Sequence, residues 1–232
     1  MPSHFKSNPA ILNEARDYFD GLLLSDGSIP YNKGIETNRY AQSCKYRLWL
    51  DIISEYLYEY GIESSVSDTF QVNNFTDGTI GFFIQTYSYI EIRDMRKRWY
   101  LKWYDIDTYP KRLWAKDKNE EYFIWKKIVP KDICLSPICV ANWYFGDGWI
   151  TNSKYKYNTY YHIGLETEGF LGDDILFLSD MLSEVLDINC HIEKNNTINI
   201  SNKDGVSTFI KYIKDCYIPS CYLKKFPREL IE

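Results

Sequence analysis

Two similar stretches organise this sequence. The first is Tyr-Phe-Asp-Gly-Leu-Leu-Leu-Ser-Asp-Gly at residues 18–27, and the second is Val-Ala-Asn-Trp-Tyr-Phe-Gly-Asp-Gly at residues 140–148. In each, an apolar run ends in a small residue followed by Asp-Gly. Upstream of each lies a helix-start signal, Asn8-Pro9 or Ser136-Pro137, in which a capping side chain precedes a proline. The sequence therefore predicts two helices that each deliver one aspartate at the C-terminal end.

The two aspartates, Asp26 and Asp147, occupy an unfavourable position for a carboxylate. The C-terminal end of a helix carries the negative end of the macrodipole. A single Asp-Gly between a helix and a strand is an ordinary turn signal, but here two copies have matching flanks. A cation bound nearby would account for both, so we treat these aspartates as candidate cation-binding residues.

The predicted elements follow the same order after each stretch. In the first half, hydrophobic periodicity predicts a continuous helix from Pro9 through Leu23, a hairpin at 28–43, a helix at 45–60, strands at 65–73 and 79–87, and a helix at 89–101. In the second half it predicts a helix ending at Asp147, a hairpin at 149–167, a helix at 173–186, strands at 190–194 and 197–201, and a helix at 205–216. An α-β-β-α-β-β-α unit thus occurs twice, which predicts an α+β fold.

The halves are expected to be residues 1–127, with a charged connector at 104–127, and residues 128–232. Periodicity also predicts which side chains face solvent. Leu48 is expected on the buried face of its helix. The basic residues Arg93, Arg96, Lys97 and Arg98 are expected to be exposed, and Thr197 and Asn199 to point away from the core.

On these motifs, the chain resembles the LAGLIDADG homing endonucleases, in the single-chain form that carries both motifs. The resemblance covers nearly the full chain. It implies a pseudo-two-fold arrangement with the motif helices packed at the centre and two four-stranded antiparallel sheets that form a DNA-binding saddle. The match has departures: Leu24 and Phe145 replace the first acid of the motif, and Asn142 and Trp143 crowd a helix face that is usually small.

The resemblance also implies a catalytic centre. Asp26 and Asp147 correspond to the catalytic acids, and they would bind two or more Mg²⁺ ions, with Mn²⁺ as a substitute, together with the carbonyl oxygens of Ser25 and Gly146. The segment 125–130 places Lys127 at the active-site lysine. The segment 219–224 places Lys224 in the same role for the second half. Lys126 and Lys225 are adjacent competitors, and the sequence leaves both choices open.

The strands are expected to supply a reading surface for the DNA major groove. A strand rises about 3.3 Å per residue, close to the ~3.4 Å step between base pairs, so eight-residue strands in both halves would follow roughly 16–20 base pairs. The candidate DNA-contacting side chains are Arg39, Gln42, Ser43, Gln71, Gln85, Thr167, Asn199 and Ser201. Glu166 is a weaker candidate, because it and Glu168 would repel phosphates.

Composition sets further bounds. The chain has 232 residues and a net charge of −5, but the charge is segregated. Residues 93–118 hold nine Lys or Arg against four Asp or Glu, residues 202–228 hold six against two, and residues 160–193 hold eight acids. The sequence contains no run of 18 apolar residues, so it predicts no membrane-spanning helix. The six cysteines form no C-x-x-C pair, which favours reduced thiols in an intracellular reducing compartment, cytoplasm or organelle matrix.

The leading hypothesis is a monomeric, Mg²⁺-dependent, site-specific endonuclease that cuts both strands of a long asymmetric DNA target and is encoded by a mobile intron or intein. An alternative is an RNA maturase that binds its own intron RNA, or a non-cleaving nucleic-acid-binding protein of the same fold. A third hypothesis, a carboxylate-pair hydrolase acting on a small substrate, has no pocket signature of its own.

Overall fold

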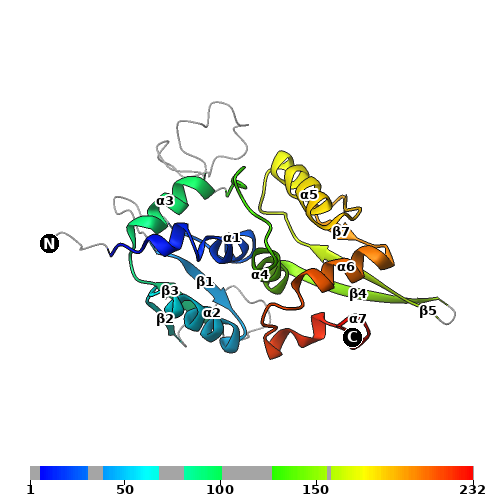
Figure 1. Ribbon diagram of the computed structural model, residues 1–232, viewed down its shortest axis with the longest axis horizontal. Coiled ribbons are helices and arrows are strands. Elements are labelled where there is room, and N and C mark those ends of the chain that lie inside the picture. The colour runs from blue at the N-terminus through cyan, green and yellow to red at the C-terminus, as the bar shows by residue number, and fades with distance from the viewer. Residues whose placement is uncertain (1–5, 31–38, 68–80, 101–126, 156–157, 232) are drawn as a thin grey trace, which may run out of the picture.

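Two helices in the middle of the molecule separate two antiparallel sheets (Figure 1). The computed structural model describes residues 6–30, 39–67, 81–100, 127–155 and 158–231. The central helices are α1 (Arg16–Leu24) and α4 (Pro137–Asp147). One sheet with α2 lies on the α1 side, and the other sheet with α5 and α6 lies on the α4 side (Figure 1). The predicted mixture of helices and two antiparallel sheets is confirmed.

The two halves use the same order of elements. After α1 the first half has β1 (Ala41–Cys44), α2 (Arg47–Glu59), β2 (Ser64–Ser67), β3 (Phe82–Thr86) and α3 (Ile90–Trp99). After α4 the second half has β4 (Gly148–Tyr155), β5 (Asn158–Leu165), α5 (Gly172–Leu186), β6 (His191–Ile192), β7 (Ile198–Ile200) and α6 (Lys203–Ile213). The chain ends with a 3-10 helix, η4 (Ser220–Lys225), and α7 (Arg228–Ile231).

The sheets also have matching strand orders. The second sheet runs β4-β5-β7-β6, with Ile150 opposite Ile163 and Ile163 opposite Ile200. The described part of the first sheet runs β1-β3-β2, and Ser28 forms an antiparallel bridge to Ala41 at the outer edge of β1. That bridge occupies the place that β4 takes in the second sheet. The turn of the predicted hairpin and the connector 104–126 lie outside the described residues.

The predicted continuous helix from Pro9 is wrong. Pro9–Leu12 forms a separate 3-10 helix, η1, which the Asn8 side chain caps by accepting a hydrogen bond from the Ala10 amide. The Ala15 amide donates to the Ala10 carbonyl at 2.8 Å, and the regular α-helical pattern begins only at Arg16. The apolar spacing persists across the break because η1 and α1 cover the same core, so periodicity alone did not reveal it.

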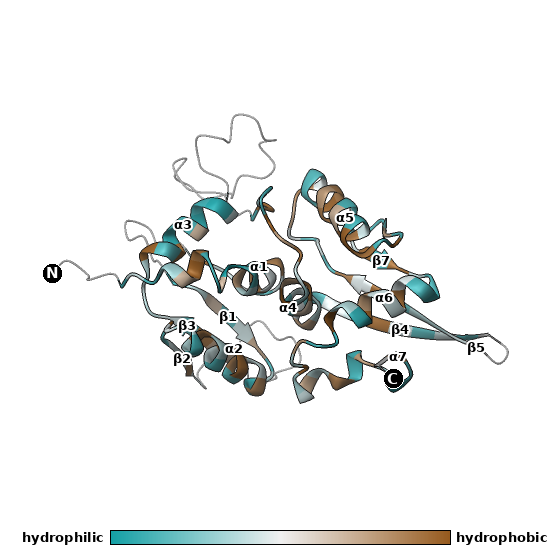
Figure 2. Cartoon of the chain, viewed as in Figure 1, coloured by the Kyte–Doolittle hydropathy of each residue, from teal (hydrophilic) through white to brown (hydrophobic). Residues whose placement is uncertain are grey.

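Three predictions of exposure are also wrong. Leu48 is 42 % exposed, whereas its neighbours Trp49 and Leu50 are buried. On α3, the guanidinium of Arg96 donates to the Ile29 carbonyl at 2.6 Å, and the side chain of Arg98 is only 16 % exposed. Hydrophilic colours nevertheless dominate α3, in contrast to the hydrophobic stripes of α2 and α5 (Figure 2). Basic residues are retained inside this helix because they have specific acceptors.

Arg98 binds a carboxylate that is fully buried in the first motif helix. Its guanidinium donates to both oxygens of Asp20, at 2.6 and 2.9 Å, and the indole nitrogen of Trp99 donates to the same carboxylate at 2.8 Å. The Arg98 Nε also donates to Asp132, 2.7 Å away in the segment that leads to α4. A buried charge needs such partners. This cluster therefore ties α3 and the start of the second half to α1.

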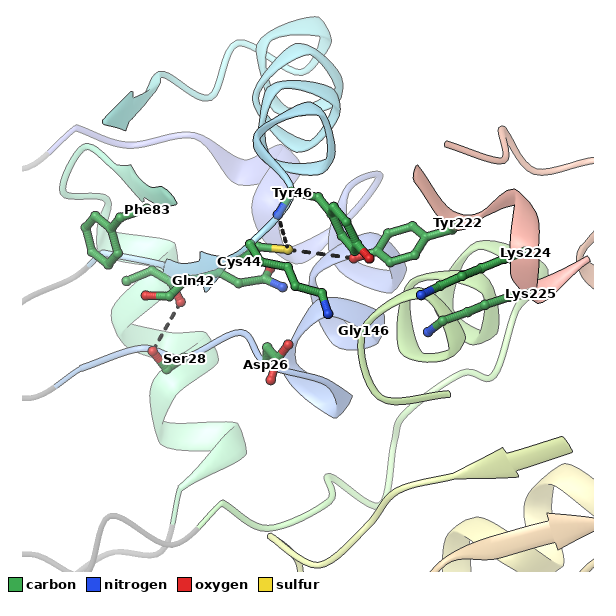
Figure 3. Close-up of a pocket in the computed structure, with 13 residues that line it drawn as sticks. Asp26, Ser28, Gln42, Cys44, Tyr46, Phe83, Gly146, Tyr222, Lys224 and Lys225 are labelled. Carbon is green, nitrogen blue, oxygen red and sulfur yellow. Dashed lines mark hydrogen bonds between the residues drawn. The ribbon is translucent and has the colours of Figure 1, made fainter. Parts of the chain in front are cut away.

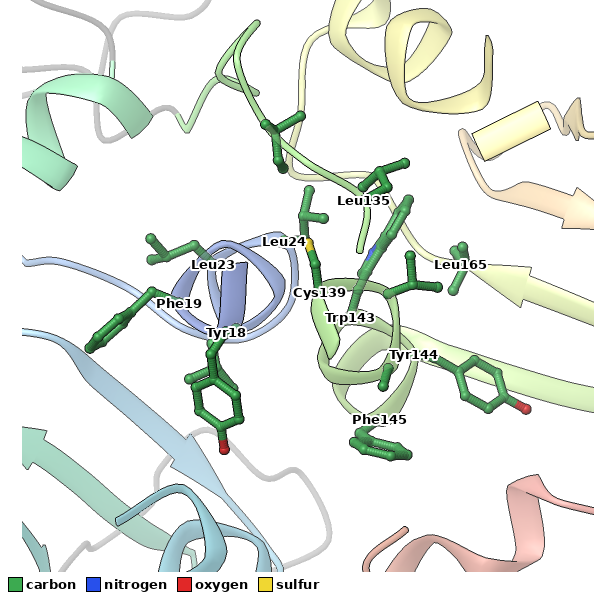
Figure 4. Close-up of a cluster of buried hydrophobic side chains, with 14 of the residues drawn as sticks. Tyr18, Phe19, Leu23, Leu24, Leu135, Cys139, Trp143, Tyr144, Phe145 and Leu165 are labelled. Carbon is green, nitrogen blue, oxygen red and sulfur yellow. The ribbon is translucent and has the colours of Figure 1, made fainter. Parts of the chain in front are cut away.

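Close approach of α1 and α4 forms the centre of the core. A Cβ placed on Gly21 would lie inside van der Waals contact of the Cys139 carbonyl oxygen, and one on Gly146 would collide with the Ser25 side chain. In Figure 4, Leu24, Cys139 and Trp143 gather on one side of the helix pair, while Tyr18 and Phe145 point to the opposite side. The backbones can approach this closely only because the facing positions lack bulk.

The crowding expected at Asn142 and Trp143 is resolved by their directions. Asn142 faces α1 opposite Gly21, and its amide donates to the Tyr18 carbonyl at 3.2 Å. Trp143 is fully buried beside Leu135 and Leu24, away from the closest contact of the helices (Figure 4). Because Gly21 on α1 has no side chain, the larger polar side chain of Asn142 on α4 fits opposite it.

Gly21→Ala should destabilise the protein. The added methyl group meets a backbone oxygen that can move only if the helices separate, and such overpacking costs about 1–3 kcal/mol, more than the ~1 kcal/mol that alanine gains over glycine in a helix. Chemical denaturation should show a lower free energy of unfolding. The matched control is Gly172→Ala at the start of α5, where an added Cβ meets nothing within 4 Å. Equal stability of the two variants would contradict the close-packing interpretation.

Candidate active site between the motif helices

The two motif aspartates lie at the same end of the central helix pair. Asp147 is the last residue of α4 and is half-buried, and Asp26 follows the last turn of α1 and reaches the surface. Beyond these ends, α4 leads directly into β4, and the chain after α1 reaches Ser28, which bridges to β1. The helices are in contact, so their C-terminal ends and their carboxylates are brought together. This is the arrangement that the doubled motif predicted.

Two lysines bind the carbonyl groups at these helix ends. The ammonium of Lys127 donates to the carbonyls of Leu23 and Ser25, at 2.9 and 2.8 Å. The ammonium of Lys225 donates to the carbonyls of Tyr144, Phe145 and Gly148, at 2.9, 2.8 and 2.5 Å. The last carbonyls of a helix lack the regular partner within the helix, so each lysine supplies donors to them, and the Tyr144 carbonyl also accepts from the Gly148 amide. Each also carries its positive charge to the negative end of a macrodipole.

These four groups shift one another's pKa. Burial raises the pKa of Asp147 to about 7, with further increases from the carboxylates of Asp26 and Glu166, while Lys127 and Lys225 lower it. The surrounding protein also raises the pKa of Asp26, again opposed by the two lysines. Burial lowers the pKa of each lysine to about 8, although the aspartates favour the charged ammonium. The site therefore holds ionisable groups with pKa values near neutrality, as catalytic sites often do.

A cavity opens on each side of the helix ends. The first, of about 480 Å³, is lined by Asp26, Gly146, Lys45, Lys224 and Lys225 among others. Figure 3 shows Lys224 and Lys225 extending side by side from η4 into this cavity. The second, of about 380 Å³, is lined by Asp147, Ser25, Lys127, Glu166 and Glu168 among others. Each cavity thus joins one motif aspartate to at least one lysine.

Glu166 belongs to the site, although the sequence analysis proposed it only as a weaker candidate DNA contact. Its amide donates to the Asp147 carbonyl at 3.0 Å. One carboxylate oxygen accepts from the indole of Trp149 at 2.6 Å and the other from the Thr197 hydroxyl at 2.9 Å. Glu166 is therefore fixed beside Asp147. Its position directly after the strand that pairs with β4 was the signal that could have identified it.

The candidate DNA-contacting residues fall into two groups. Arg39 and Ser43 are exposed, as is Ser201, and Gln85 is half-buried and accepts from Arg39 at 3.3 Å. Gln42, Thr167 and Asn199 are buried, 2 %, 1 % and 4 % exposed, so none is open to solvent and the expectation that Asn199 points away from the core is wrong. Gln71 lies outside the described residues.

The buried candidates hydrogen-bond within the protein. Gln42 accepts from the Tyr40 hydroxyl, Thr167 donates to the Asn196 carbonyl, and Asn199 donates to Glu193 at 3.0 Å. Thr197, also predicted to face out, is fully buried where it donates to Glu166. For three of these four residues the partner lies on another segment: Asn196 for Thr167, Glu193 for Asn199 and Glu166 for Thr197. Alternation along one strand cannot reveal such partners.

Oxygen donors dominate the centre of the site. Among the described residues, no group of three or more His, Cys, Asp and Glu side chains is arranged to hold a metal ion. Mg²⁺ does not require such a group, because it retains waters and needs only one or two carboxylates plus substrate oxygens. Burial, and next the carboxylate of Asp26, raise the pKa of Asp147, and the two lysines offset this rise only in part. The donor set of Asp26, Asp147 and nearby carbonyls therefore fits a hard divalent cation.

Asp147→Asn should stabilise the protein in the absence of metal. A carboxyl group whose pKa is raised by folding opposes folding once it ionises. Its unfavourable contribution to the free energy of folding therefore grows as the pH rises from about 4 to about 7, and it stays constant above that. After allowance for its partial exposure, we expect a gain of about 1–2 kcal/mol at pH 8, and little gain at pH 4. Denaturation in EDTA across this pH range measures it. Asp180→Asn, on the exposed surface of α5, controls for the loss of one charge. A destabilised Asp147→Asn at pH 8 would show that the carboxylate is structurally required.

Comparison with known proteins agrees with this geometry. Residues 102–215 match the model of the LAGLIDADG DNA endonuclease family. An uncharacterized protein of Methanocaldococcus jannaschii, MJ1098, is 24 % identical over 220 residues, which cover 93 % of this chain and 74 % of that protein. Both matches extend across the second motif helix, and the second also reaches into the first half.

Solved structures of DNA-bound homing endonucleases share the fold. I-WcaI bound to its DNA recognition sequence superposes with a TM-score of 0.67 at 18 % identity, covering 96 % of this chain and 88 % of that one. The meganuclease I-SmaMI, bound to uncleaved DNA in the presence of calcium ions, gives a TM-score of 0.51 at 11 % identity, covering 90 % and 87 %. With both motifs in place at the centre of such a fold, the predicted resemblance to the LAGLIDADG homing endonucleases in their single-chain, two-motif form is confirmed.

Proposed function

We propose that this protein is a site-specific endonuclease that hydrolyses one phosphodiester bond in each strand of double-stranded DNA. The observation that carries this proposal is the paired constellation at the helix ends. Asp26 and Asp147 converge there, and Lys127 and Lys225 are each held against the terminal carbonyls of one motif helix. A structural turn would require neither the second carboxylate nor two half-buried lysines.

Asp26 and Asp147 would hold Mg²⁺, with Mn²⁺ as a substitute, and the carbonyl oxygens of Ser25 and Gly146 are the proposed additional donors. Divalent ions in such a site polarise the phosphate and lower the pKa of bound water. The Ser25 carbonyl already accepts from Lys127, but a carbonyl oxygen has two lone pairs, so it retains one for a second partner. I-SmaMI, a relative in fold, was captured on its uncleaved DNA target with calcium ions present.

The lysines would stabilise the negative charge that develops on the phosphate during hydrolysis. With a pKa of about 8, Lys127 and Lys225 are mostly protonated at pH 7 yet close to their titration midpoint. Hydrogen bonds to helix carbonyls fix their direction, so little reorganisation is required in the transition state. We assign the second lysine role to Lys225, because its ammonium occupies the place at α4 that Lys127 occupies at α1. Lys224, which is exposed and lines the same cavity, would contact the phosphate backbone.

The two sheets would read a long asymmetric target, which a single chain can do as a monomer. Arg39, Ser43, Gln85 and Ser201 reach the surface of the sheets or their ends and would contact base edges directly. Gln42, Thr167 and Asn199 would contact DNA only after exchanging their internal hydrogen bonds. The Oδ1 of Asn199 is buried without a partner, so this side chain has an unused acceptor. A long, rare target is consistent with our proposal that the gene lies in a mobile intron or intein.

A non-cleaving nucleic-acid-binding protein, such as a maturase that binds its own intron RNA, is a second candidate. The observation that favours it is the carboxylate of Glu166, fixed beside Asp147 where a DNA phosphate would approach. Filter binding of the flanking intron RNA, with duplex DNA as competitor, separates the two functions. Tight RNA binding without cleavage of any selected DNA would favour the maturase. The six cysteines are all free thiols, as a reducing compartment would maintain them, and no described helix is long and apolar enough to cross a membrane.

Asp26→Asn and Asp147→Asn should each abolish double-strand cleavage while preserving DNA binding. Each removes a metal ligand, yet each also lessens repulsion of the phosphates. Lys127→Ala and Lys225→Ala should slow cleavage by about 10²-fold, the scale of losing one charge-stabilising group, and Lys224→Ala should slow it less. The target is first selected from a randomised duplex library with Mg²⁺. A supercoiled plasmid carrying that site is then scored for nicked and linear product, and gel shifts measure binding.

The matched control is Lys211→Ala on the exposed side of α6, which removes one positive charge from a residue that lines neither cavity. It should cleave at the wild-type rate. Full linearisation by Asp147→Asn would mean that Asp147 is only a turn residue, and the proposed function would then fail. A stronger defect in Lys224→Ala than in Lys225→Ala would reverse the assignment of the second lysine.

A further inference from the structure

The two halves of the site have different charges at equivalent positions. Ser28 bridges to Ala41 in the first half, and Gly148 pairs with Leu165 in the second. If the antiparallel pairing Ser28–Ala41 is extended by two residues toward α1, Ser43 lies opposite Asp26. If the pairing Gly148–Leu165 is extended by one residue toward α4, Glu166 lies opposite Asp147. Two residues further along the chain stand Lys45 in the first half and Glu168 in the second. A polar or basic pair in one half therefore corresponds to an acidic pair in the other.

These residues line the two cavities of the site. Lys45 lines the cavity of Asp26 together with Lys224 and Lys225. Glu168 lines the cavity of Asp147 together with Glu166 and Lys127. Among the lining residues that the structure describes, the Asp26 cavity has three ammonium groups and one carboxylate, whereas the Asp147 cavity has one ammonium and three carboxylates. Lys45 and Glu168 are both exposed, so neither is required by the core.

A DNA phosphate must approach each cavity with the same negative charge. In water, one unit charge about 6 Å from a phosphate changes the affinity for that phosphate by roughly threefold. The two cavities differ by several such charges, and all of these differences favour phosphate binding in the Asp26 cavity. The Asp26 cavity should therefore hold a phosphate at least about tenfold better than the Asp147 cavity at low salt. Because Lys45, Glu168 and Lys224 are exposed, salt should screen the difference.

We propose that Lys45 and Glu168 make the two strand-cleaving halves unequal, Lys45 by positioning the phosphate of one strand and Glu168 by opposing that of the other. This inference rests on the proposed function. In each half, one water adds across a P–O bond: its oxygen bonds to phosphorus, and the displaced oxygen leaves with a proton. The strand held in the Asp26 cavity is cut first, and a nicked duplex accumulates before the second cut.

A supercoiled plasmid carrying the selected target tests the order of cleavage. Each strand is labelled separately, and the reaction with Mg²⁺ at low salt is stopped at early times. The wild-type protein should nick the same strand first in at least about nine of ten products, the ratio that follows from a tenfold difference in phosphate binding. Raising NaCl should move the ratio toward one. The double variant Lys45→Glu/Glu168→Lys should reverse which strand is nicked first.

Two single variants serve as matched controls, because each neutralises one charge without reversal. Lys45→Gln should slow the first cut, Glu168→Gln should speed the second, and both should reduce the strand bias. Equal nicking of the strands by the wild type, or the same first strand in the charge-reversed variant, would overturn this inference and leave the proposed endonuclease intact. An uncut plasmid with wild-type protein would overturn both. Thermal melting of each variant checks that a changed bias does not come from partial unfolding.

Discussion

The close contact of α1 with α4 is the constraint on which the rest of the structure depends. Gly21 admits the Cys139 carbonyl and the Asn142 side chain, and the small Ser25 and Gly146 meet one turn later. Two helices can bring their C-terminal ends together only if the facing residues are this small. Because each helix leads directly into a sheet, their separation also determines the spacing of the two sheets. A change of volume at this contact would therefore be transmitted to both reading surfaces.

The contact places unfavourable charge in the middle of the molecule. Two carboxylates meet at the negative ends of two helix dipoles, and burial raises the pKa of Asp147 to about 7. Lys127 and Lys225 offset part of this cost, but burial lowers the pKa of each to about 8. Elsewhere the chain pairs its buried charges well, as at Asp20 and Arg98. At the site, by contrast, the compensation is incomplete, and a bound cation and a phosphate would complete it.

The pseudo-two-fold symmetry relates backbone elements more closely than it relates side chains. The strand orders agree, and each motif helix has its lysine, yet Tyr222 stacks on Phe145, whereas the corresponding residue of the first motif is Leu24, which has no aromatic ring. The surfaces beside the two aspartates differ in sign of charge. Selection on the core acts through packing, which tolerates little change, while exposed residues such as Lys45 and Glu168 can diverge at small cost to stability. A single chain can therefore treat the two strands of an asymmetric target differently.

The sequence by itself determined the two helices, the aspartate at the end of each, the order of the strands and the repeated unit. These features follow from local rules of periodicity, capping and turn chemistry, and a second copy of the motif separated them from chance. Tertiary structure alone decided that the regular helix begins at Arg16. It also selected Lys225 to bind the end of α4, and it buried Gln42, Thr167 and Asn199. The physical reason is that these outcomes depend on neighbours distant in the chain: adjacent lysines are equivalent until a helix end lies beside one of them, and a strand residue is exposed only if no side chain from the next strand covers it.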